Sequence, residues 1–304
     1  MWPRLIGSGR LPALLAGSAL FLVCSSTASA VDSGPVLSKS VKQGEAFAVR
    51  VPESALVAGS GSDDLVARFG GRDWPAFSTP DGAGVLMAVD LDGAPGVQDF
   101  VVERREPDGA TVVARGAVIV ENGAFGVQTL TLPDKQVDLD ADTLRRVETE
   151  QNAMLAAMEP ITPRLWDGAF VAPAKGKIQQ SFGRRRVING QPRNPHTGED
   201  ISAPQGAAVV AINHGTVRLV ADQFFSGKSV VIDHGLGLYS MYFHLSEVSV
   251  RVGDRVTTAQ VIGAVGATGR ASGPHLHWGV RLNGARINPL SLNTALNGVM
   301  TAAH

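Results

Sequence analysis

The chain has 304 residues, of which 44% are hydrophobic and 18% are charged. This composition is too apolar for a disordered chain, and the 35 glycines follow no strict period, which excludes a collagen-like protein. The formal net charge of −1 gives no support for nucleic-acid binding, so no nucleic-acid partner is expected.

Residues 1–30 have the pattern of a secretory signal peptide. Two arginines in the first ten residues precede an apolar run over 11–26, and Ala28-Ser29-Ala30 is a small-x-small cleavage site. The alternative is a buried helix or a membrane anchor, but the run is short for a span of ~20 residues. Cleavage after Ala30 removes Cys24, the only cysteine, so the mature chain has no structural disulfide. We expect an exported protein of the periplasm or cell envelope, with no membrane span after cleavage.

Residues 31–135 are predicted to form an Ig-like β-sandwich domain. Short strand-like runs recur about every ten residues here and are separated by turns that contain glycine or proline. The runs Phe100–Arg104 and Thr111–Arg115 flank the turn signal Pro107-Asp108-Gly109. These two runs are therefore predicted to form a β-hairpin.

The segment 136–164 is predicted to be a linker helix. Its central part lacks glycine and proline and spaces its apolar residues at helical intervals. Asp140 or Asp142 is suited to cap its start, and Pro160 and Pro163 end it. The alternative is a helix that belongs to the core of the second β region.

Residues 165–292 are again strand-like, with turns that contain glycine between the apolar runs. The chain is therefore predicted to be mainly β, with a C-terminal antiparallel β-sheet domain over these residues. The last segment, 293–304, is small and polar, and it is predicted to be a flexible tail.

Two histidine clusters carry the chemistry of the second region. His196 and Asp200 are four residues apart on a predicted loop that enters a strand, and each offers one ligand to a metal such as zinc. The alternative for this pair alone is a pair of surface residues without a metal. His275 and His277 are two residues apart on a predicted strand, so both project from one face. Such a pair favours a metal or a neutral network, because two adjacent imidazolium ions repel each other. His244 ends an apolar run between the two clusters.

These segments, in this order, resemble the lysostaphin-type (LytM-type) zinc endopeptidases that cut peptidoglycan cross-links. The resemblance covers about residues 165–290. Its motifs are His196-Thr197-Gly198-Glu199-Asp200, Asp233-His234-Gly235, Tyr242-Phe243-His244-Leu245 and Gly273-Pro274-His275-Leu276-His277. The order of an Ig-like segment, a helix and this domain is also similar to the exported multi-domain members of the family.

The resemblance implies one Zn²⁺ held by His196, Asp200 and His277, with His244 and His275 as unligated catalytic imidazoles. Three protein ligands leave a fourth zinc position for water, as expected of a catalytic site. The implied activity is hydrolysis of peptide cross-links, and the implied partners are the peptide stems of peptidoglycan. Which imidazole is the general base stays open.

Two features of the sequence depart from the family pattern. Some members have a tyrosine on the loop before the first ligand, but the loop 184–193 has none. His214 stands in a turn and is interpreted as a surface residue rather than a ligand. The loop also carries Arg184–Arg186 and Arg193, which are either solvated charges or contacts to carboxylates of the peptide stems.

Two other functions remain as alternatives. A non-catalytic member that activates cell-wall amidases would have lost ligands, and a zinc D,D-carboxypeptidase would trim terminal D-alanine. A separate hypothesis concerns regulation: the first β domain is proposed to cover the groove of the second and to act as an intramolecular competitor. The alternative for that domain is a spacer or a wall-targeting module.

Overall fold

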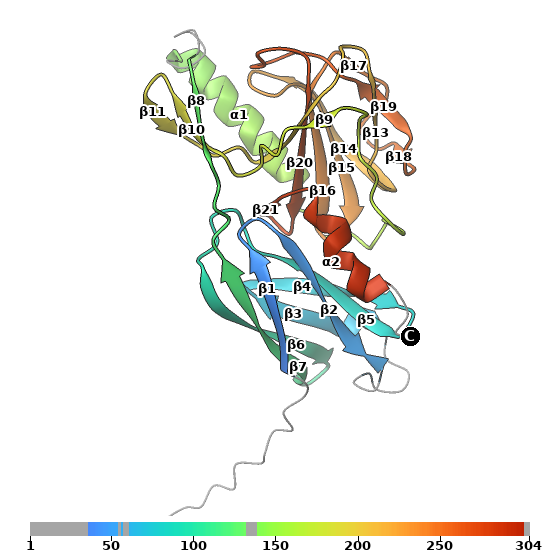
Figure 1. Cartoon of the computed structure of the whole chain (residues 1–304). Helices are drawn as coiled ribbons and strands as arrows, with labels where there is room; N and C mark the ends of the chain where they lie inside the picture. Colours follow the sequence, from blue (N-terminus) through green and yellow to red (C-terminus); the bar gives the residue numbers. More distant parts are fainter. Residues whose placement is uncertain (1–35, 54–55, 57–60, 132–138, 301–304) are drawn as a thin grey trace, which may run out of the picture. The chain divides into compact units, whose positions relative to one another are not determined.

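The computed structural model describes residues 36–53, 56, 61–131 and 139–300, and it is built mainly of β-strands (Figure 1). The mainly β class predicted from the sequence is therefore confirmed. The predicted signal peptide and its cleavage site lie outside the described residues. None of the helices in the described part of the chain combines the length and apolar character needed to cross a membrane.

The first sheet contains the first seven strands of the chain. They are β1 (Val36–Lys42), β2 (Ala46–Pro52), β3 (Leu65–Phe69), β4 (Arg72–Thr79), β5 (Gly82–Ala88), β6 (Gly96–Glu106) and β7 (Gly109–Glu121), with a 3-10 turn, η2 (Ser62–Asp64), before β3. The spatial order is β1-β7-β6-β3-β4-β5-β2. The two edge strands, β1 and β2, are joined by residues 43–45 alone, so the sheet must curl until its edges lie close together.

The predicted hairpin is present in this first sheet. Strands β6 and β7 pair antiparallel around Glu106 and Gly109, and the φ of Gly109 is +151°. Along β7, Ala114, Val118 and Val120 are buried on one face, as the two-residue period of a strand requires. The Ig-like topology itself is not tested by these observations and stays a prediction.

The second sheet is antiparallel throughout. Its strands are β9 (Lys177–Ile178), β12 (Gly198–Ser202), β14 (Gly215–Gln223), β15 (Gly227–Gly235), β16 (Leu238–Leu245), β18 (Arg255–Val256), β20 (Leu276–Leu282) and β21 (Ala285–Ile287). The order is β18-β14-β15-β16-β20-β12-β9, and β21 pairs with β20. The predicted C-terminal antiparallel sheet is therefore confirmed.

Two small sheets complete the strand pairing. One consists of β13 (Ala208–Val210), β17 (Glu247–Val248) and β19 (Val261–Ala264), with β19 in the centre. The other consists of β8 (Val127–Leu130), β10 (Arg185–Ile188) and β11 (Gln191–Arg193), with β10 in the centre. Strand β8 pairs parallel with β10, so a segment from before the helix lies beside the loop that precedes β12.

The predicted linker helix is shorter than expected and packs on the second sheet. Helix α1 (Ala141–Ala157) begins after Asp140, whose Oδ1 accepts from Thr143 N at 2.7 Å, so the predicted N-cap is confirmed. Residues 158–164 are not helical, and 136–138 lie outside the described residues. Met158 is buried against β15 and β16, and Glu150 accepts from Phe224 N at 2.8 Å. No residue of α1 is itself buried, so the helix lies on the surface of the second region, and its role as a linker stays a prediction.

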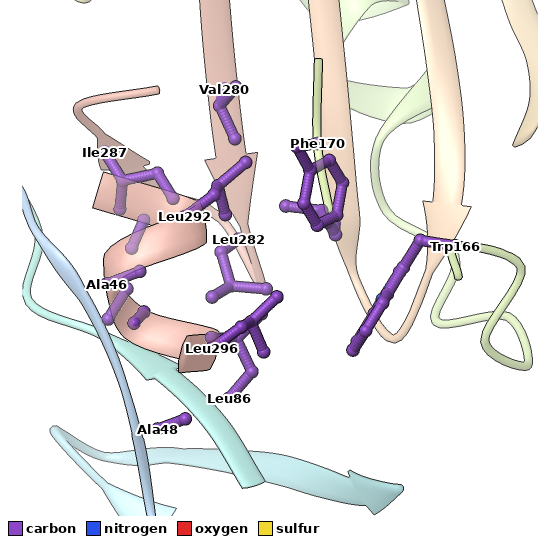
Figure 2. Close-up of a cluster of buried hydrophobic side chains, with 14 of the residues drawn as sticks. Ala46, Ala48, Leu86, Trp166, Phe170, Val280, Leu282, Ile287, Leu292 and Leu296 are labelled. Atoms are coloured by element: carbon purple, nitrogen blue, oxygen red, sulfur yellow. The ribbon is translucent and has the colours of Figure 1, made fainter. Parts of the chain in front are cut away.

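The predicted flexible tail is wrong over residues 293–300. These residues belong to helix α2 (Ser291–Met300), which contacts β2 and β5 of the first sheet. Leu292 and Leu296 are buried beside Ala46, Leu86 and residues of β20 and β21 (Figure 2). The segment folds because its leucine, alanine and valine residues recur at helical spacing and pack on an apolar surface. The small polar residues between them made this spacing hard to recognise in the sequence. Residues 301–304 lie outside the described residues.

Candidate metal and catalytic site

Three neighbouring strands of the second sheet bring the predicted site residues together. In the antiparallel register, Asp200 of β12 lies opposite His277 of β20, and His277 in turn lies opposite Phe243 of β16. The rings of Phe243 and His277 stack with a centroid distance of 5.3 Å and an interplanar angle of 6°. This stacking holds the plane of the His277 imidazole relative to Asp200.

His196, Asp200 and His277 converge on one point. The distances are 2.9 Å between His196 Nε2 and His277 Nδ1, 3.1 Å between His196 Nε2 and Asp200 Oδ1, and 3.0 Å between His277 Nδ1 and Asp200 Oδ1. Two tetrahedral zinc ligands with bonds of 2.0–2.1 Å are about 3.3 Å apart, which is close to these values. The three donor atoms therefore have a spacing close to that of three of the four ligands of a tetrahedral zinc site.

The hydrogen bond of His196 to the backbone shows why these donors fit a cation. His196 Nδ1 lies 3.1 Å from Ser181 O, and a carbonyl only accepts, so Nδ1 carries a proton and a lone pair for a metal can only be on Nε2. That lone pair faces Asp200 Oδ1, which is also an acceptor. Two acceptors at this distance repel each other unless a proton or a cation lies between them. Imidazole and carboxylate donors suit zinc.

The protonation states of these groups agree with a ligand role. Burial lowers the pKa of His277 to about 4, so the ring is neutral at pH 7. Burial would raise the pKa of Asp200, but the rings of His196 and His277 outweigh this effect when they are protonated and face the carboxylate with N–H donors, so the pKa of Asp200 lies well below its usual range. A neutral imidazole and an ionised carboxylate are the forms that coordinate metals.

Gly198 is required by the close approach of β12 and β20. A Cβ at this position would lie 2.6 Å from His277 Nε2 and 2.7 Å from Trp278 O. Any side chain would therefore displace the ring that supplies Nδ1. This gives a physical reason for the glycine between His196 and Asp200 in the sequence motif.

A buried network behind the site orients His196, and the sequence analysis assigned no role to it. Glu199 is only 1% exposed and accepts from Ser181 N at 2.9 Å, from Ser181 Oγ at 3.1 Å and from Phe182 N at 3.4 Å. Ser181 Oγ also accepts from Asp200 N at 2.9 Å. The network thus fixes the carbonyl that holds His196 and the backbone of Asp200. The sequence signal for it was an acid between two predicted ligands, on the opposite face of the strand.

His244 and His275 lie beside the three converging donors. His244 Nδ1 donates to Thr268 O at 2.8 Å, and His275 Nδ1 donates to Gly273 O at 2.9 Å, so Nε2 is the nitrogen of each ring that is left to act as an acceptor. Their ring centroids are 4.7 Å apart, and His275 Nε2 is 3.9 Å from Asp200 Oδ1. Burial, with a smaller contribution from His277, lowers the pKa of His244 to about 4. His244 also has a left-handed backbone, with φ of +64°, which is strained for a residue with a side chain.

The histidines that the sequence analysis left out of the ligand set lie elsewhere. His234 is buried, with Nδ1 donating to His214 O at 2.7 Å and Nε2 lying 2.7 Å from Ser240 Oγ. His214 is half-buried in the turn before β14. Neither lines the pocket that contains the three donors.

The histidine pocket is a cavity of about 320 Å³. Its lining residues come from several segments: Gln128, Leu130, Arg186, Ile188, Pro195, His196, Thr197, Asp200, Phe225, Ser226, Phe243, His244, Arg270, Ala271, Ser272, His275 and His277. All five predicted site residues are among them. Leu276 and Trp278, between and after the paired histidines, are buried in the apolar core as the strand period predicts.

The four arginines of the loop 184–193 lie in different surroundings. Arg186 lines the histidine pocket, whereas Arg185 forms an ion pair with Asp92 at 2.8 Å on the other face of β10. Arg184 donates to Gln179 O at 3.2 Å, and Arg193 is exposed on β11. Thus Arg186 is the one of these four arginines that lines the histidine pocket.

Comparison with known proteins finds a family and named relatives. Residues 194–289 match the model of peptidase family M23. The chain is 36% identical over 125 residues to the peptidoglycan DD-endopeptidase ShyA of Vibrio cholerae, covering 41% of this chain and 29% of that protein. It is 43% identical over 116 residues to the DD-carboxypeptidase/endopeptidase Mpg of Neisseria meningitidis, covering 38% of this chain and 27% of that protein. The matched part is thus less than a third of either relative.

One solved structure is similar over most of the chain. It is the crystal structure of a Pseudomonas aeruginosa protein described as an M23 peptidase, with 30% sequence identity and a TM-score of 0.63. The similarity covers 83% of this chain and 95% of that one. The likeness therefore includes the first sheet as well as the matched C-terminal region. This chain belongs to peptidase family M23.

Proposed function

We propose that this protein is a zinc-dependent endopeptidase that hydrolyses peptide cross-links of bacterial peptidoglycan. The observation that carries the proposal is the convergence of His196 Nε2, Asp200 Oδ1 and His277 Nδ1 in a pocket that also contains two further imidazoles. A non-catalytic member of the family would need none of these side chains, whereas this chain retains all five in one place.

His196, Asp200 and His277 would hold one Zn²⁺. When bound, zinc polarises a peptide carbonyl and makes water a stronger acid. Asp200 would contribute one negative charge, so a site holding Zn²⁺ would have a net charge of +1 and would still attract an oxyanion. The Ser181–Glu199 network holds the first ligand in place, as supporting hydrogen bonds do around other metal sites.

His244 and His275 would move the protons of the reaction. Each ring carries its proton on Nδ1 and presents a lone pair on Nε2, which suits a general base for the attacking water. After accepting that proton, the ring can donate it to the leaving amine. The second imidazole can donate a hydrogen bond to the developing oxyanion only when its Nε2 has also taken a proton from solvent. The loop 184–193 has no tyrosine for this task, so the two histidines are proposed to perform it.

The substrate proposal rests on the named relatives. ShyA is a peptidoglycan DD-endopeptidase, which supports cleavage of cross-links. Mpg is a DD-carboxypeptidase/endopeptidase, and its 43% identity supports a second candidate function, removal of terminal D-alanine. Both reactions use the same metal and the same imidazoles, so they differ only in the group on the amine side of the cleaved bond.

The decisive experiment digests purified sacculi of known cross-link chemistry with the mature protein and identifies the products by mass spectrometry. Cross-linked dimers should be released as monomers, and chelation should abolish this release. Loss of terminal D-alanine without release of monomers would favour the carboxypeptidase. Absence of both products in the zinc-loaded protein would contradict the proposed function.

Two variants test the roles separately. Asp200→Ala should lose both the metal and the activity, because it removes a ligand. His244→Ala should keep about one zinc per chain by elemental analysis and lose activity. Loss of the metal from His244→Ala would show that the ligand assignment is wrong.

An exported location and a covering role of the first β region belong to the same proposal. The apolar N-terminal segment and the cell-wall relatives support export to the periplasm or envelope. Gln128 and Leu130 of β8 line the histidine pocket, which supports control of access by the part of the chain that precedes α1. If β8 restricts access, Leu130→Ala should digest sacculi faster than the unaltered protein, and equal or slower digestion would discard the covering role.

A further inference from the structure

Two guanidinium groups lie in the histidine pocket beside the candidate metal ligands. Arg186 and Arg270 line it, and Asp200 is the one acidic residue among the described residues that do. With Asp200 assigned to the metal, no second carboxylate among the described residues lines the pocket with these two cations. A cavity with this charge favours an anionic substrate.

Strand pairing determines that Arg186 faces the pocket. In the parallel register of β8 and β10, Arg186 lies opposite Gln128 and Ile188 lies opposite Leu130, and all four line the pocket. Because side chains alternate along a strand, Arg185 points to the other face. Arg186 Nε donates to Gln128 Oε1 at 3.4 Å, which steadies the side chain through a neutral partner and keeps its charge.

Arg270 lies in the loop between β19 and β20 and lines the same pocket as Arg186. Its guanidinium lies 4.0 Å from the centroid of the Phe225 ring, and its backbone N donates to Phe225 O at 2.9 Å. Burial lowers the pKa of Arg270, and repulsion from Arg186 and Arg193 lowers it further. Like charges in a half-buried cavity repel each other, and a carboxylate between them relieves this repulsion.

The position of the two arginines restricts where that carboxylate lies on the substrate. Arg186 and Asp200 line the same cavity of about 320 Å³, so an anion bound by Arg186 lies near the peptide bond that faces the metal ligands. In a D-Ala–D-Ala peptide, the residue that supplies the amine carries the terminal carboxylate. In a cross-link to diaminopimelate, the linked amine has a free carboxylate on the same carbon. A glycine bridge offers no such group inside the chain.

Resting on the proposed function, we propose that Arg186, with Arg270 beside it, binds the carboxylate on the amine side of the scissile bond and selects DD-linked substrates. The planar guanidinium of Arg186 binds this group in a two-pronged contact, which also positions the scissile carbonyl between the metal ligands and His275. Peptides that lack a carboxylate at this position are poor substrates.

The test compares substrates that differ only in this carboxylate. One pair is a stem pentapeptide ending in D-Ala–D-Ala with a free terminus or a terminal carboxamide. The other is a cross-linked dimer with the diaminopimelate carboxylate free or amidated. A charge-assisted two-pronged contact predicts that the free form has a kcat/KM about 10- to 100-fold higher. The pair that shows the preference identifies which source of the carboxylate the site reads.

Variants assign the preference to Arg186. Arg186→Gln should lower kcat/KM for the free carboxylate and leave the amide almost unchanged, so that the two forms differ by less than about threefold. Arg186→Lys keeps the charge but loses the planar guanidinium that makes two parallel hydrogen bonds, so its preference for the free carboxylate should be intermediate. Arg185→Gln is the matched control, because it removes a neighbouring arginine from the opposite face, and it should retain the full preference.

Binding without turnover gives an independent measurement. Isothermal titration calorimetry on full-length, zinc-loaded His244→Ala should give at least tenfold tighter binding for the free carboxylate than for the amide, and Arg186→Gln in this background should remove the difference. Equal binding of both forms, or an equal loss on both forms in Arg186→Gln, overturns the inference. If the unaltered protein cleaves neither pair and no sacculi, the proposed function has failed, and the calorimetry still decides whether the pocket reads a carboxylate.

Discussion

The two large sheets of this protein are built from similar strands but have different interiors. The first sheet surrounds an apolar core, and among its described residues the buried polar side chains are Ser62 and Arg104. The second sheet and its loops bury many polar groups: Ser181, His196, Glu199, Asn213, Gln223, Ser229, Asp233, His234, Ser240, His244 and His277. Buried polar groups lower stability unless each has a partner. Their concentration in the second sheet therefore indicates that this sheet carries the functional site, at a cost in stability wherever a partner is lost.

The largest expected effect on stability lies in the first sheet. Phe47 is fully buried there, with its ring 5.2 Å from that of Phe69. Phe47→Ala should lower the free energy of unfolding by about 3–5 kcal/mol, measured by urea denaturation, because it leaves a cavity. Zinc content per folded molecule should not change. The exposed Val97→Ala is the control, and a loss in Phe47→Ala as small as in that variant would contradict an apolar core.

A smaller loss of stability, but a loss of metal affinity, is expected from the buried network of the second sheet. In Glu199→Gln, the NH₂ group of the new amide would lie opposite Phe182 N, so two donors would face each other. Buried donors without an acceptor should lower the free energy of unfolding by about 1–3 kcal/mol. Zinc affinity, measured by chelator competition, should fall about 10- to 100-fold because His196 loses its fixed support. The exposed Glu247→Gln should change neither quantity. Unchanged zinc affinity in Glu199→Gln would remove the network from the site.

The buried His234 should make stability depend on pH. Burial lowers its pKa in the folded state to about 4, whereas the unfolded chain has the ordinary value of about 6.5. Above pH 6.5 the ring is neutral in both states, and between pH 6.5 and 4 the unfolded chain binds a proton that the folded chain does not. Stability is therefore lost as the pH falls through this window.

The measurement compares urea denaturation at pH 7.5 and pH 5.0. The unaltered protein should lose about 2 kcal/mol more between these values than His234→Gln, because the variant has no ring to titrate. His214→Gln removes a histidine from the neighbouring turn and should behave like the unaltered protein. If His234→Gln has the same pH dependence as the unaltered protein, His234 is not the group responsible.

The smallest expected effect concerns the helix between the two sheets. Asp140 Oδ1 caps α1 at the surface, so Asp140→Ala should lower the free energy of unfolding by less than any of the changes above. Asp140→Ser retains an acceptor for Thr143 N and should recover most of this loss. If the proposed function is right, the rate of cleavage of cross-linked substrate should not change. A reduced rate in Asp140→Ala would show that α1 acts on the catalytic sheet rather than only packing on it.

Local patterns in the sequence were sufficient for much of this fold. The hairpin at Gly109, the cap at Asp140 and the shared face of His275 and His277 each depend on residues a few positions apart. Such features follow from backbone conformation and side-chain periodicity, which are properties of a short segment. The grouping of His196, Asp200 and His277 was predicted through a family resemblance. The spacing of His196 and Asp200 alone also suits a surface pair without a metal, and the spacing of His275 and His277 alone also suits a neutral network.

The features that the sequence did not reveal depend on contacts between distant segments. Helix α2 forms where its leucines meet β2 and β5, more than 200 residues earlier in the chain. Gln128 reaches the pocket because β8 pairs with β10, and Arg186 is distinguished from Arg185 only by the face that this pairing selects. Glu199 becomes a support for His196 only when Ser181 lies against it. In each case a side chain acquires its role from a partner that no local pattern specifies, because packing across the fold decides which groups meet.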